Sequence, residues 1–170
     1  RIVLIVSDFV IKLTIDNKVT VYQYNALDQL VQVQKSEAGT ITDTLIYAYD
    51  IDGNRVNLQE NGSETRFIVD NNQAYAQVVQ EQDASGQTQV SYLYGDDLLQ
   101  QQRGTEVSHY HYDGLGSTRL LTDATGALTD RYRYEAFGDA IEELGNTTNR
   151  YRFTGEQHDS NLGFYYLRAR

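Results

Sequence analysis

Two histidines on one predicted strand come nearest to a metal site by residue type and spacing. His109 and His111 flank Tyr110, so both imidazoles point to the same face of an extended strand. Such a pair can share a metal ion, with Asp113 or His158 as a further ligand. The spacing matches no zinc pattern, and nothing in the sequence brings His158 close. We therefore expect solvent-facing strand histidines, with no metal and no other cofactor.

The stretch Asp50-Ile-Asp-Gly-Asn54 superficially resembles a calcium loop. An EF-hand loop needs glycine at its sixth position and glutamate at its twelfth. Counted from Asp50, the glycine is fourth and the twelfth residue is Asn61. The stretch is therefore predicted to be a turn.

Acid–base and nucleophilic chemistry have no better support. The pairs Asp96-Asp97 and Glu142-Glu143 are adjacent, and adjacent strand residues point to opposite faces. Most other acidic residues fall in predicted turns, where nothing indicates burial or pairing that would shift a pKa. No serine lies in a nucleophile elbow, no glycine-rich loop opens a helix, and there are no cysteines. We expect that the chain has no catalytic residues and is not an enzyme.

Arginine alternates with aromatic residues over 131–134 and 150–153. In a strand this spacing gives one basic face and one aromatic face. Such faces could recognise a glycan or peptide by stacking and charge. They could equally pair with acidic residues on neighbouring strands. Because similar pairs recur along the chain, we favour the cross-strand role.

The composition favours an acidic, folded β protein. Hydrophobic residues make up 40% of the chain, and tyrosine outnumbers phenylalanine fourteen to five. A tyrosine face is apolar in body but carries hydroxyls that need partners, which favours a semi-wet surface over a dry core. The net charge of −10 argues against nucleic acid and anionic membranes as partners. No stretch approaches the ~20 apolar residues of a membrane span.

Tyr-x-Tyr pairs organise the chain. Ten of the fourteen tyrosines fall in such pairs. Residues 67–69 (Phe-Ile-Val) form a degenerate copy of the pair in the long interval between Tyr49 and Tyr92. Most pairs lead into a turn rich in Asp, Asn and Gly, after which a second strand is predicted. A recurring unit of this size must stack on its neighbours to bury its apolar face. The five pairs are Tyr22/Tyr24, Tyr47/Tyr49, Tyr92/Tyr94, Tyr110/Tyr112 and Tyr132/Tyr134.

The predicted fold is all-β, an antiparallel meander of tyrosine-bearing hairpins. We expect about ten to twelve short strands, near the size at which a twisted sheet curls or closes. Asn61-Gly62 is the strongest hairpin signal, and the absence of proline suits strands that donate hydrogen bonds on both edges. Only Ala140–Leu144 favours a turn of helix. No linker marks a boundary, so one continuous repeat domain is predicted.

These motifs resemble the YD repeats of RHS proteins. Residues 47–55 (YAYDIDGNR) and 110–119 (YHYDGLGSTR) are similar to that repeat, and 110–170 resembles the RHS-associated core segment. The resemblance covers roughly nine-tenths of the chain, counting weaker repeats. It divides the chain into degenerate repeats over 1–109 and the core segment over 110–170. The pieces that match the core segment, in order, are 114–119, 122–126, 132–138, 151–155 and 162–166.

The residues singled out by the resemblance are expected to build the repeat and not to react. They are Tyr47, Tyr49, Asp50, Gly53, Arg55, Tyr92, Tyr94, Tyr110, Tyr112, Asp113, Gly116, Arg119, Tyr132, Tyr134, Gly138, Tyr151, Phe153, Gly155, Gly163, Tyr165 and Tyr166.

The resemblance implies a curled or spiralling sheet that forms part of a hollow β-shell. In polymorphic toxin systems such a shell encloses a variable toxin, and in teneurins a related shell serves cell-surface adhesion. A structural shell segment of a secreted or cell-surface bacterial protein is therefore expected. Its expected partners are neighbouring repeats of the same protein or copies of itself, together with an enclosed toxin polypeptide. The alternatives are an adhesion module that binds glycans or a protein, and a self-assembling extracellular fibre or tube.

The resemblance also implies what could release the toxin. In bacterial members an Asp-Pro-rich plug follows the core segment, and its aspartates cut the chain. This sequence has no proline and ends at Arg170, so we expect both plug and toxin to be missing. It also lacks methionine, so we expect a fragment or a processed product.

Overall fold

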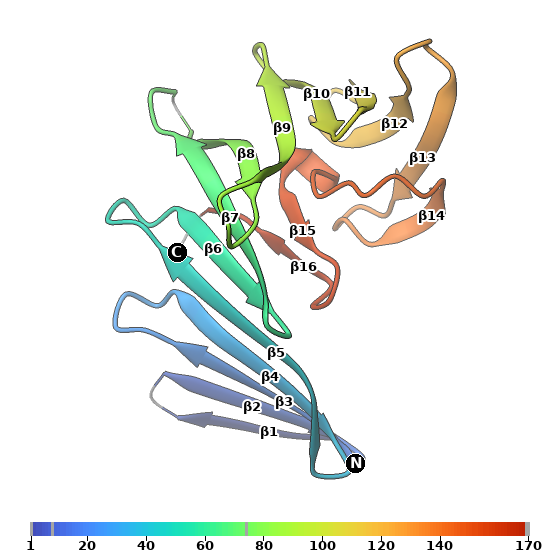
Figure 1. Cartoon of the computed structure of the whole chain (residues 1–170). Coiled ribbons are helices and arrows are strands. Elements are labelled where there is room, and N and C mark those ends of the chain that lie inside the picture. Colours follow the sequence, from blue (N-terminus) through green and yellow to red (C-terminus); the bar gives the residue numbers. More distant parts are fainter. Residues whose placement is uncertain (1, 8, 74, 169–170) are drawn as a thin grey trace. The chain divides into compact units, whose positions relative to one another are not determined.

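The computed structural model describes residues 2–7, 9–73 and 75–168, and it is an all-β fold (Figure 1). Fourteen strands lie side by side in one antiparallel sheet whose spatial order is the sequence order, as the alternating pattern predicts. They are β1 (Ile2–Ser7), β2 (Val10–Ile15), β3 (Lys18–Tyr24), β4 (Leu30–Glu37), β5 (Thr40–Tyr49), β6 (Arg55–Glu60), β7 (Ser63–Asp70), β8 (Gln77–Gln82), β9 (Thr88–Tyr94), β10 (Leu98–Arg103), β11 (Glu106–Tyr112), β12 (Thr118–Thr122), β13 (Leu128–Tyr134) and β14 (Ala140–Leu144).

The strand count exceeds the expected ten to twelve at both ends of the chain. Strands β1 and β2, which carry no repeat motif, pair in antiparallel register. After β14, a short 3₁₀ turn, η1 (Phe153–Gly155), leads to a separate hairpin of β15 (Gln157–Asp159) and β16 (Phe164–Tyr166). The tyrosine repeat therefore underestimates the number of strands, because it does not mark the short strands at the two ends of the chain.

The helical turn expected at Ala140–Leu144 is wrong, because this stretch is strand β14. Its backbone pairs with β13 in antiparallel register, which places Glu142 opposite Arg133. The two side chains approach to 3.6 Å. Pairing with a neighbouring strand overrides the weak local preference of five residues.

The strand expected at 150–153 is also wrong. Only Tyr151 makes a β-bridge there, to Gln157. The chain then turns through η1, where Thr154 has φ 51° and Gly155 has φ 70°. These left-handed values cannot continue an extended strand, so the basic and aromatic faces predicted for this stretch do not form.

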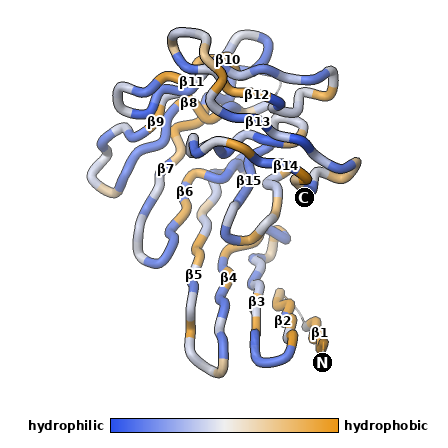
Figure 2. The backbone as a smooth tube through the Cα atoms, turned by 90° about the vertical axis from the view of Figure 1, so that its right-hand side faces the viewer, coloured by the Kyte–Doolittle hydropathy of each residue, from blue (hydrophilic) through white to orange (hydrophobic). Residues whose placement is uncertain are grey.

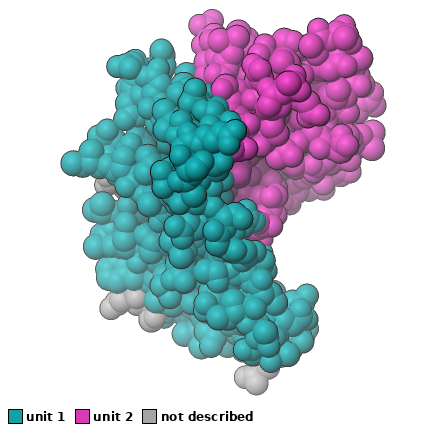
Figure 3. Space-filling view, viewed as in Figure 1, with its two compact units in different colours: residues 1–88, 170 teal, residues 89–169 magenta. Residues whose placement is uncertain are grey.

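The chain consists of two compact units (Figure 3). The first comprises the described residues up to Thr88, and the second those from Gln89 onward. This boundary does not coincide with the division between 109 and 110, which separates repeat types and remains a prediction.

Each unit has its own buried row on one face of the sheet. Positions two apart, such as Leu45 and Tyr47 or Val90 and Tyr92, are buried together, as strand alternation requires. The hydropathy colouring of Figure 2 also shows apolar residues along β1 and β2. There Ile2, Leu4 and Val6 are 61–71% exposed on the first strand of the sheet.

Candidate functional site

The three histidines do not form a metal site with acidic residues. Within the described ranges, no three His, Cys, Asp or Glu side chains lie close enough to hold a metal ion. His111 Nε2 lies 3.0 Å from Thr122 Oγ1, while His158 packs on Tyr165 in the C-terminal hairpin. The same described ranges contain no helix of the length and apolarity needed to cross a membrane.

In the described residues, a side-chain oxygen closes five turns in the same way. In the turn after β11, Asp113 Oδ1 accepts hydrogen bonds from the backbone N–H groups of Leu115 (2.9 Å) and Ser117 (3.0 Å). Gly116 lies between them with φ 79°, a value that suits glycine. The same two bonds recur at Asn25, Asp50, Asp83 and Asp123. At Asn25 the glycine position is taken by Asp28, with φ 58°.

These hydrogen bonds shift the pKa values of turn carboxylates, contrary to our expectation. Burial acts to raise the pKa of Asp113, but bonds from Leu115, Ser117 and Arg119 outweigh it and lower the pKa. For Asp123, the bond from the Thr125 hydroxyl is the main cause of a lowered pKa. A lowered pKa keeps these groups ionised at neutral pH, which suits structural acceptors and not general acids.

In two of the Tyr-x-Tyr pairs the two rings lie stacked. Tyr132 and Tyr134 have centroids 6.4 Å apart and planes within 6°. Tyr110 and Tyr112 stack similarly, at 5.9 Å and 11°. The second tyrosine then binds back to the preceding strand. Tyr112 donates its hydroxyl hydrogen bond to the carbonyl of Leu98, the first residue of β10.

The same tyrosine bond occurs in the first unit, where Tyr49 donates to the carbonyl of Leu30 at 2.8 Å. Leu30 is the first residue of β4, just as Leu98 is of β10. The repeated motif thus produces a repeated contact.

Burial is the main cause that raises the pKa of Tyr132 to about 12, so its phenol stays neutral at physiological pH.

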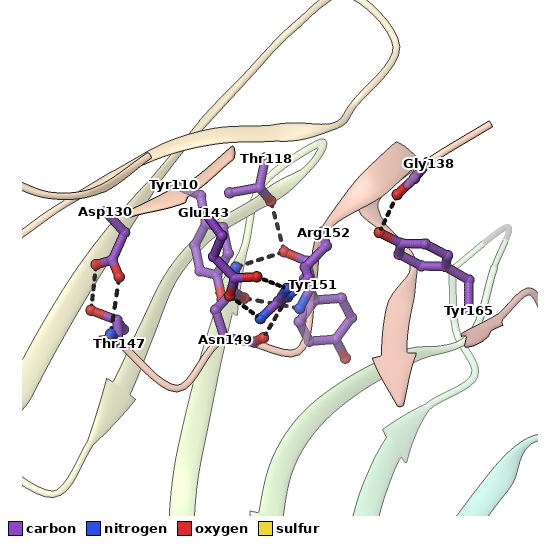
Figure 4. Close-up of polar contacts among 10 residues, drawn as sticks. All are labelled: Tyr110, Thr118, Asp130, Gly138, Glu143, Thr147, Asn149, Tyr151, Arg152 and Tyr165. Atoms are coloured by element: carbon purple, nitrogen blue, oxygen red, sulfur yellow. Dashed lines mark hydrogen bonds and ion pairs between the residues drawn. The ribbon is translucent and has the colours of Figure 1, made fainter. Parts of the chain in front are cut away.

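In the second unit we call the side of the sheet that bears Tyr110 and Tyr132 the tyrosine face. Residues 145–156 lie against this face, and we call them the C-terminal strap (Figure 4). The sheet binds the strap through its backbone. Gln101 Nε2 donates to the carbonyl of Thr148 at 3.1 Å. Thr118 donates from its hydroxyl to the carbonyl of Tyr151 (2.8 Å) and from its backbone N–H to that of Arg152 (3.0 Å).

The Asn149 side chain joins the strap to the sheet and to the strap's own backbone. Its amide oxygen lies 2.9 Å from the Tyr110 hydroxyl and accepts the Tyr151 N–H at 2.9 Å. Its amide nitrogen donates to the Tyr151 carbonyl, also at 2.9 Å. The Tyr110 hydroxyl lies equally close to Gln101 Oε1. Tyr110 and Tyr151 are buried core residues whose hydroxyls have polar partners, whereas tyrosines such as Tyr22 and Tyr49 are half-buried, in line with the semi-wet surface expected from the sequence.

Arg152 fixes the strap by charge. Its guanidinium makes two hydrogen bonds to the Glu143 carboxylate of β14, at 2.5 and 2.7 Å. It also lies over the Tyr132 ring, 5.5 Å from the centroid. With the ion pair of Arg133 and Glu142, these contacts agree with the structural role favoured for the arginines.

The start of the strap depends on a close approach to β13. Asp130 is buried and accepts hydrogen bonds from the backbone N–H and the hydroxyl of Thr147. A Cβ atom at Gly145 would lie 2.2 Å from Asp130 Oδ1. Only glycine fits where the chain turns back onto the sheet.

The other predicted repeat residues lie in several strands and turns of the fold. Arg55 follows the Asp50 turn, with its guanidinium 5.4 Å from the Tyr47 ring centroid and 5.6 Å from that of Phe67. Arg119 follows the Asp113 turn and lies 5.4 Å from the Tyr134 ring centroid. The remaining ones divide between strands and turns: Tyr92 and Tyr94 in β9, Gly53 in the turn after β5, Gly138 in the turn after β13, Phe153 and Gly155 in η1, Gly163 in the turn before β16, and Tyr165 and Tyr166 in β16.

Comparisons with known proteins agree with this geometry. No family model matches the chain. It is 35% identical over 164 residues to the tRNA3(Ser)-specific nuclease WapA of Bacillus spizizenii, and equally to the tRNA nuclease WapA of Bacillus subtilis strain 168. Each match covers 92% of this chain. The chain belongs to the RHS/YD-repeat family. It spans 7% of the length of these curated relatives.

Two solved structures share the RHS-type fold of this chain. The TcdB2-TccC3 crystal structure superposes with a TM-score of 0.66 over 89% of this chain at 18% identity. The Photorhabdus luminescens Tc holotoxin pore structure gives 0.58 over 90% at 19% identity. The chain covers 8% of each of these two larger chains.

Sequence reasoning missed four residues that position the strap in this RHS chain. They are Gln101, Asp130, Gly145 and Asn149. One signal was present for Asp130, which shares the strand alternation of Tyr132 and Tyr134 and must therefore face inward with them. No local signal marks Asn149, whose partner Tyr110 is distant in sequence.

Proposed function

We propose that this chain is a structural segment of an encapsulating RHS shell, in a protein that bacteria secrete or deliver at their surface. The observation that carries the proposal is the uninterrupted antiparallel order β1 to β14, which is not closed into a barrel. A sheet of that kind extends by adding strands at its edge. The exposed apolar side chains of β1 support such an extension.

The proposed partners are further repeats of the same protein and a toxin polypeptide inside the shell. The similarity to WapA supports a toxin context, because those relatives are named as tRNA nucleases and this chain matches a small part of each. The likeness to the TcdB2-TccC3 and Tc holotoxin structures supports the fold that such a wall would have.

Protease protection tests the encapsulation. The complete product of the gene that encodes this chain is digested with trypsin, as the wild type and as Gly145→Ala, which clashes with Asp130 at the start of the strap. In the wild type we expect trypsin to leave both the shell and an enclosed polypeptide intact. In Gly145→Ala we expect the enclosed polypeptide to be digested faster. Gly126→Ala is the matched control, because a Cβ there meets nothing within 4 Å. Equal digestion of all three proteins, with no protected species, contradicts the proposal.

We also propose that this segment itself is not catalytic. Asp130, one of three buried carboxylates with Glu81 and Asp159 in the described residues, accepts hydrogen bonds from Thr147, and the turn carboxylates Asp50, Asp113 and Asp123 have lowered pKa values. The purified chain is incubated for days from about pH 4 to about pH 8, alone and with tRNA. Unchanged intact mass and intact tRNA are expected. A time-dependent fragment that one Asp→Asn substitution abolishes would reveal an active site.

Edge-to-edge assembly is the second candidate, and β1 is the observation that favours it. Ile2, Leu4 and Val6 expose apolar side chains on the first strand of the sheet. Electron micrographs of the isolated chain would show filaments if the edges pair, and uniform small particles if they do not.

Glycan recognition by Tyr132 and Tyr134 has less support. Both rings are buried, at 2% and 8% exposure, beside Arg152 and Phe153. A glycan array on the purified chain would still detect adhesion through other surfaces, and saturable binding would favour that role.

A further inference from the structure

His158 joins the C-terminal hairpin to the strap. It lies opposite Tyr165 in the register of β15 and β16, with ring centroids 5.0 Å apart. Its backbone N–H donates to the carbonyl of Arg150 in the strap at 2.7 Å. Tyr165 in turn donates its hydroxyl hydrogen bond to the carbonyl of Gly138, in the turn between β13 and β14, at 3.1 Å (Figure 4). These bonds hold the hairpin to the strap and to the Gly138 turn, and Gln157 adds a β-bridge to Tyr151 and a hydrogen bond from its amide nitrogen to the Tyr151 hydroxyl at 2.9 Å.

The His158 ring lacks an acceptor at one nitrogen. Its Nδ1 is buried and makes no hydrogen bond within the ranges that the structure describes. The neutral ring can keep its proton on Nε2, so that Nδ1 holds only a lone pair. The imidazolium must carry a second N–H at Nδ1. A buried N–H without an acceptor loses its hydration with no compensation.

The charged groups around the His158 ring do not reverse the preference of the site for the neutral imidazole. Burial is the main cause that lowers the pKa of His158 from the ordinary 6.5, and the Arg152 guanidinium in the strap adds to it. Asp159 on the same strand and Glu143 on β14 act in the opposite direction without reversing the shift. The neighbouring Tyr165 contributes a phenol whose own pKa is raised by burial, so it stays uncharged.

We propose that His158 is an acid-sensitive latch, whose protonation loosens the β15–β16 hairpin from the strap and from the Gly138 turn. The neutral ring fits the site and the charged ring does not. The stabilisation is therefore complete above the unfolded-state pKa of about 6.5, and it is lost as pH falls through the lower folded-state pKa. The device depends only on contacts within the second unit, so it stands apart from the question of what a shell would enclose.

An NMR titration of the wild-type chain tests the latch without any substitution. The ring resonances of His109, His111 and His158 are followed from about pH 8 to about pH 4.5. We expect His158 to titrate below the ordinary 6.5, with shift changes at Tyr165 and Gly138 over the same pH range. A His158 midpoint at or above the ordinary 6.5 would overturn the proposal.

Hydrogen exchange then tests the consequence. Exchange across 157–166, corrected for intrinsic rates, is compared near pH 7.5 and near pH 5.5. We expect acid to increase it roughly threefold or more in the wild type, and to leave it unchanged in His158→Gln, which stays neutral. His111→Gln is the control, because His111 is exposed in β11 and should keep the wild-type response. An equal acid response in the wild type and His158→Gln contradicts the latch.

Discussion

Tyr110 and Asn149 meet with 2.9 Å between the phenolic oxygen and the amide oxygen, although 39 residues separate them in the chain. Tyr110 belongs to the repeat that builds the sheet, and Asn149 belongs to the strap that covers it. The contact shows how one repeat residue serves both as core and as an anchor for a segment outside the repeat.

Removing the Asn149 side chain is expected to release the strap. Asn149→Ala deletes the contact with the Tyr110 hydroxyl and both hydrogen bonds to the Tyr151 backbone, at a cost of about 3 kcal/mol in the free energy of unfolding, while the Thr118 hydroxyl still donates to the Tyr151 carbonyl. Asn146→Ala, at an exposed strap position, should change it by less than about 0.5 kcal/mol. Urea denaturation compares the two variants. Similar midpoints would show that the strap does not depend on this network.

Gly138 is expected to be far less replaceable than a glycine of similar backbone geometry. Gly138 and Gly126 have φ of 96° and 84°, but a Cβ at Gly138 would lie 2.8 Å from the Phe153 ring. Gly126→Ala should cost about 1–2 kcal/mol from the left-handed backbone alone. Gly138→Ala should add about 1–3 kcal/mol for the clash. Thermal unfolding checks the difference, and equal losses would contradict the packing around Phe153.

The strands and turns were predictable from the sequence because their causes are local. Alternation over a few residues defines a strand, and Asp113 with Gly116 defines a turn through bonds that span four residues. The strap was not predictable, because its positions depend on distant partners. Gln101 and Thr148 lie 47 residues apart, and neither carries a pattern of its own. Strand β14 was missed for the same reason, since β13 determines it.

The Arg152–Glu143 pair is expected to need its two-point geometry. Arg152→Lys keeps the charge but loses the bidentate contact, which should destabilise the strap by about 1 kcal/mol. Arg131→Lys is the matched control, because Arg131 is exposed on the same sheet. A double-mutant cycle with Glu143→Gln isolates the pair. A coupling energy near zero would assign the role of Arg152 to its packing over Tyr132.

Acid should weaken the turn after β11 through Asp113. Its folded-state pKa lies below the ordinary 3.8, so its stabilising effect is present above that value and is lost as pH falls below it. Asp113→Asn keeps an oxygen that can accept the turn bonds, as Asn25 does, but loses the charge that pairs with Arg119. Denaturation below about pH 4 should therefore be less steep in this variant than in Asp96→Asn, an exposed control. An equal fall in stability below about pH 4 in the two variants would contradict the stabilising role of the Asp113 charge.

Electron cryo-microscopy of the complete gene product tests the central claim most directly. We predict that β1 to β14 continue into further strands of one wall, with the tyrosine face toward an enclosed volume that contains polypeptide density. A wall that ends at β1, or a tyrosine face turned to solvent with no enclosed volume, would contradict a structural role in an encapsulating shell.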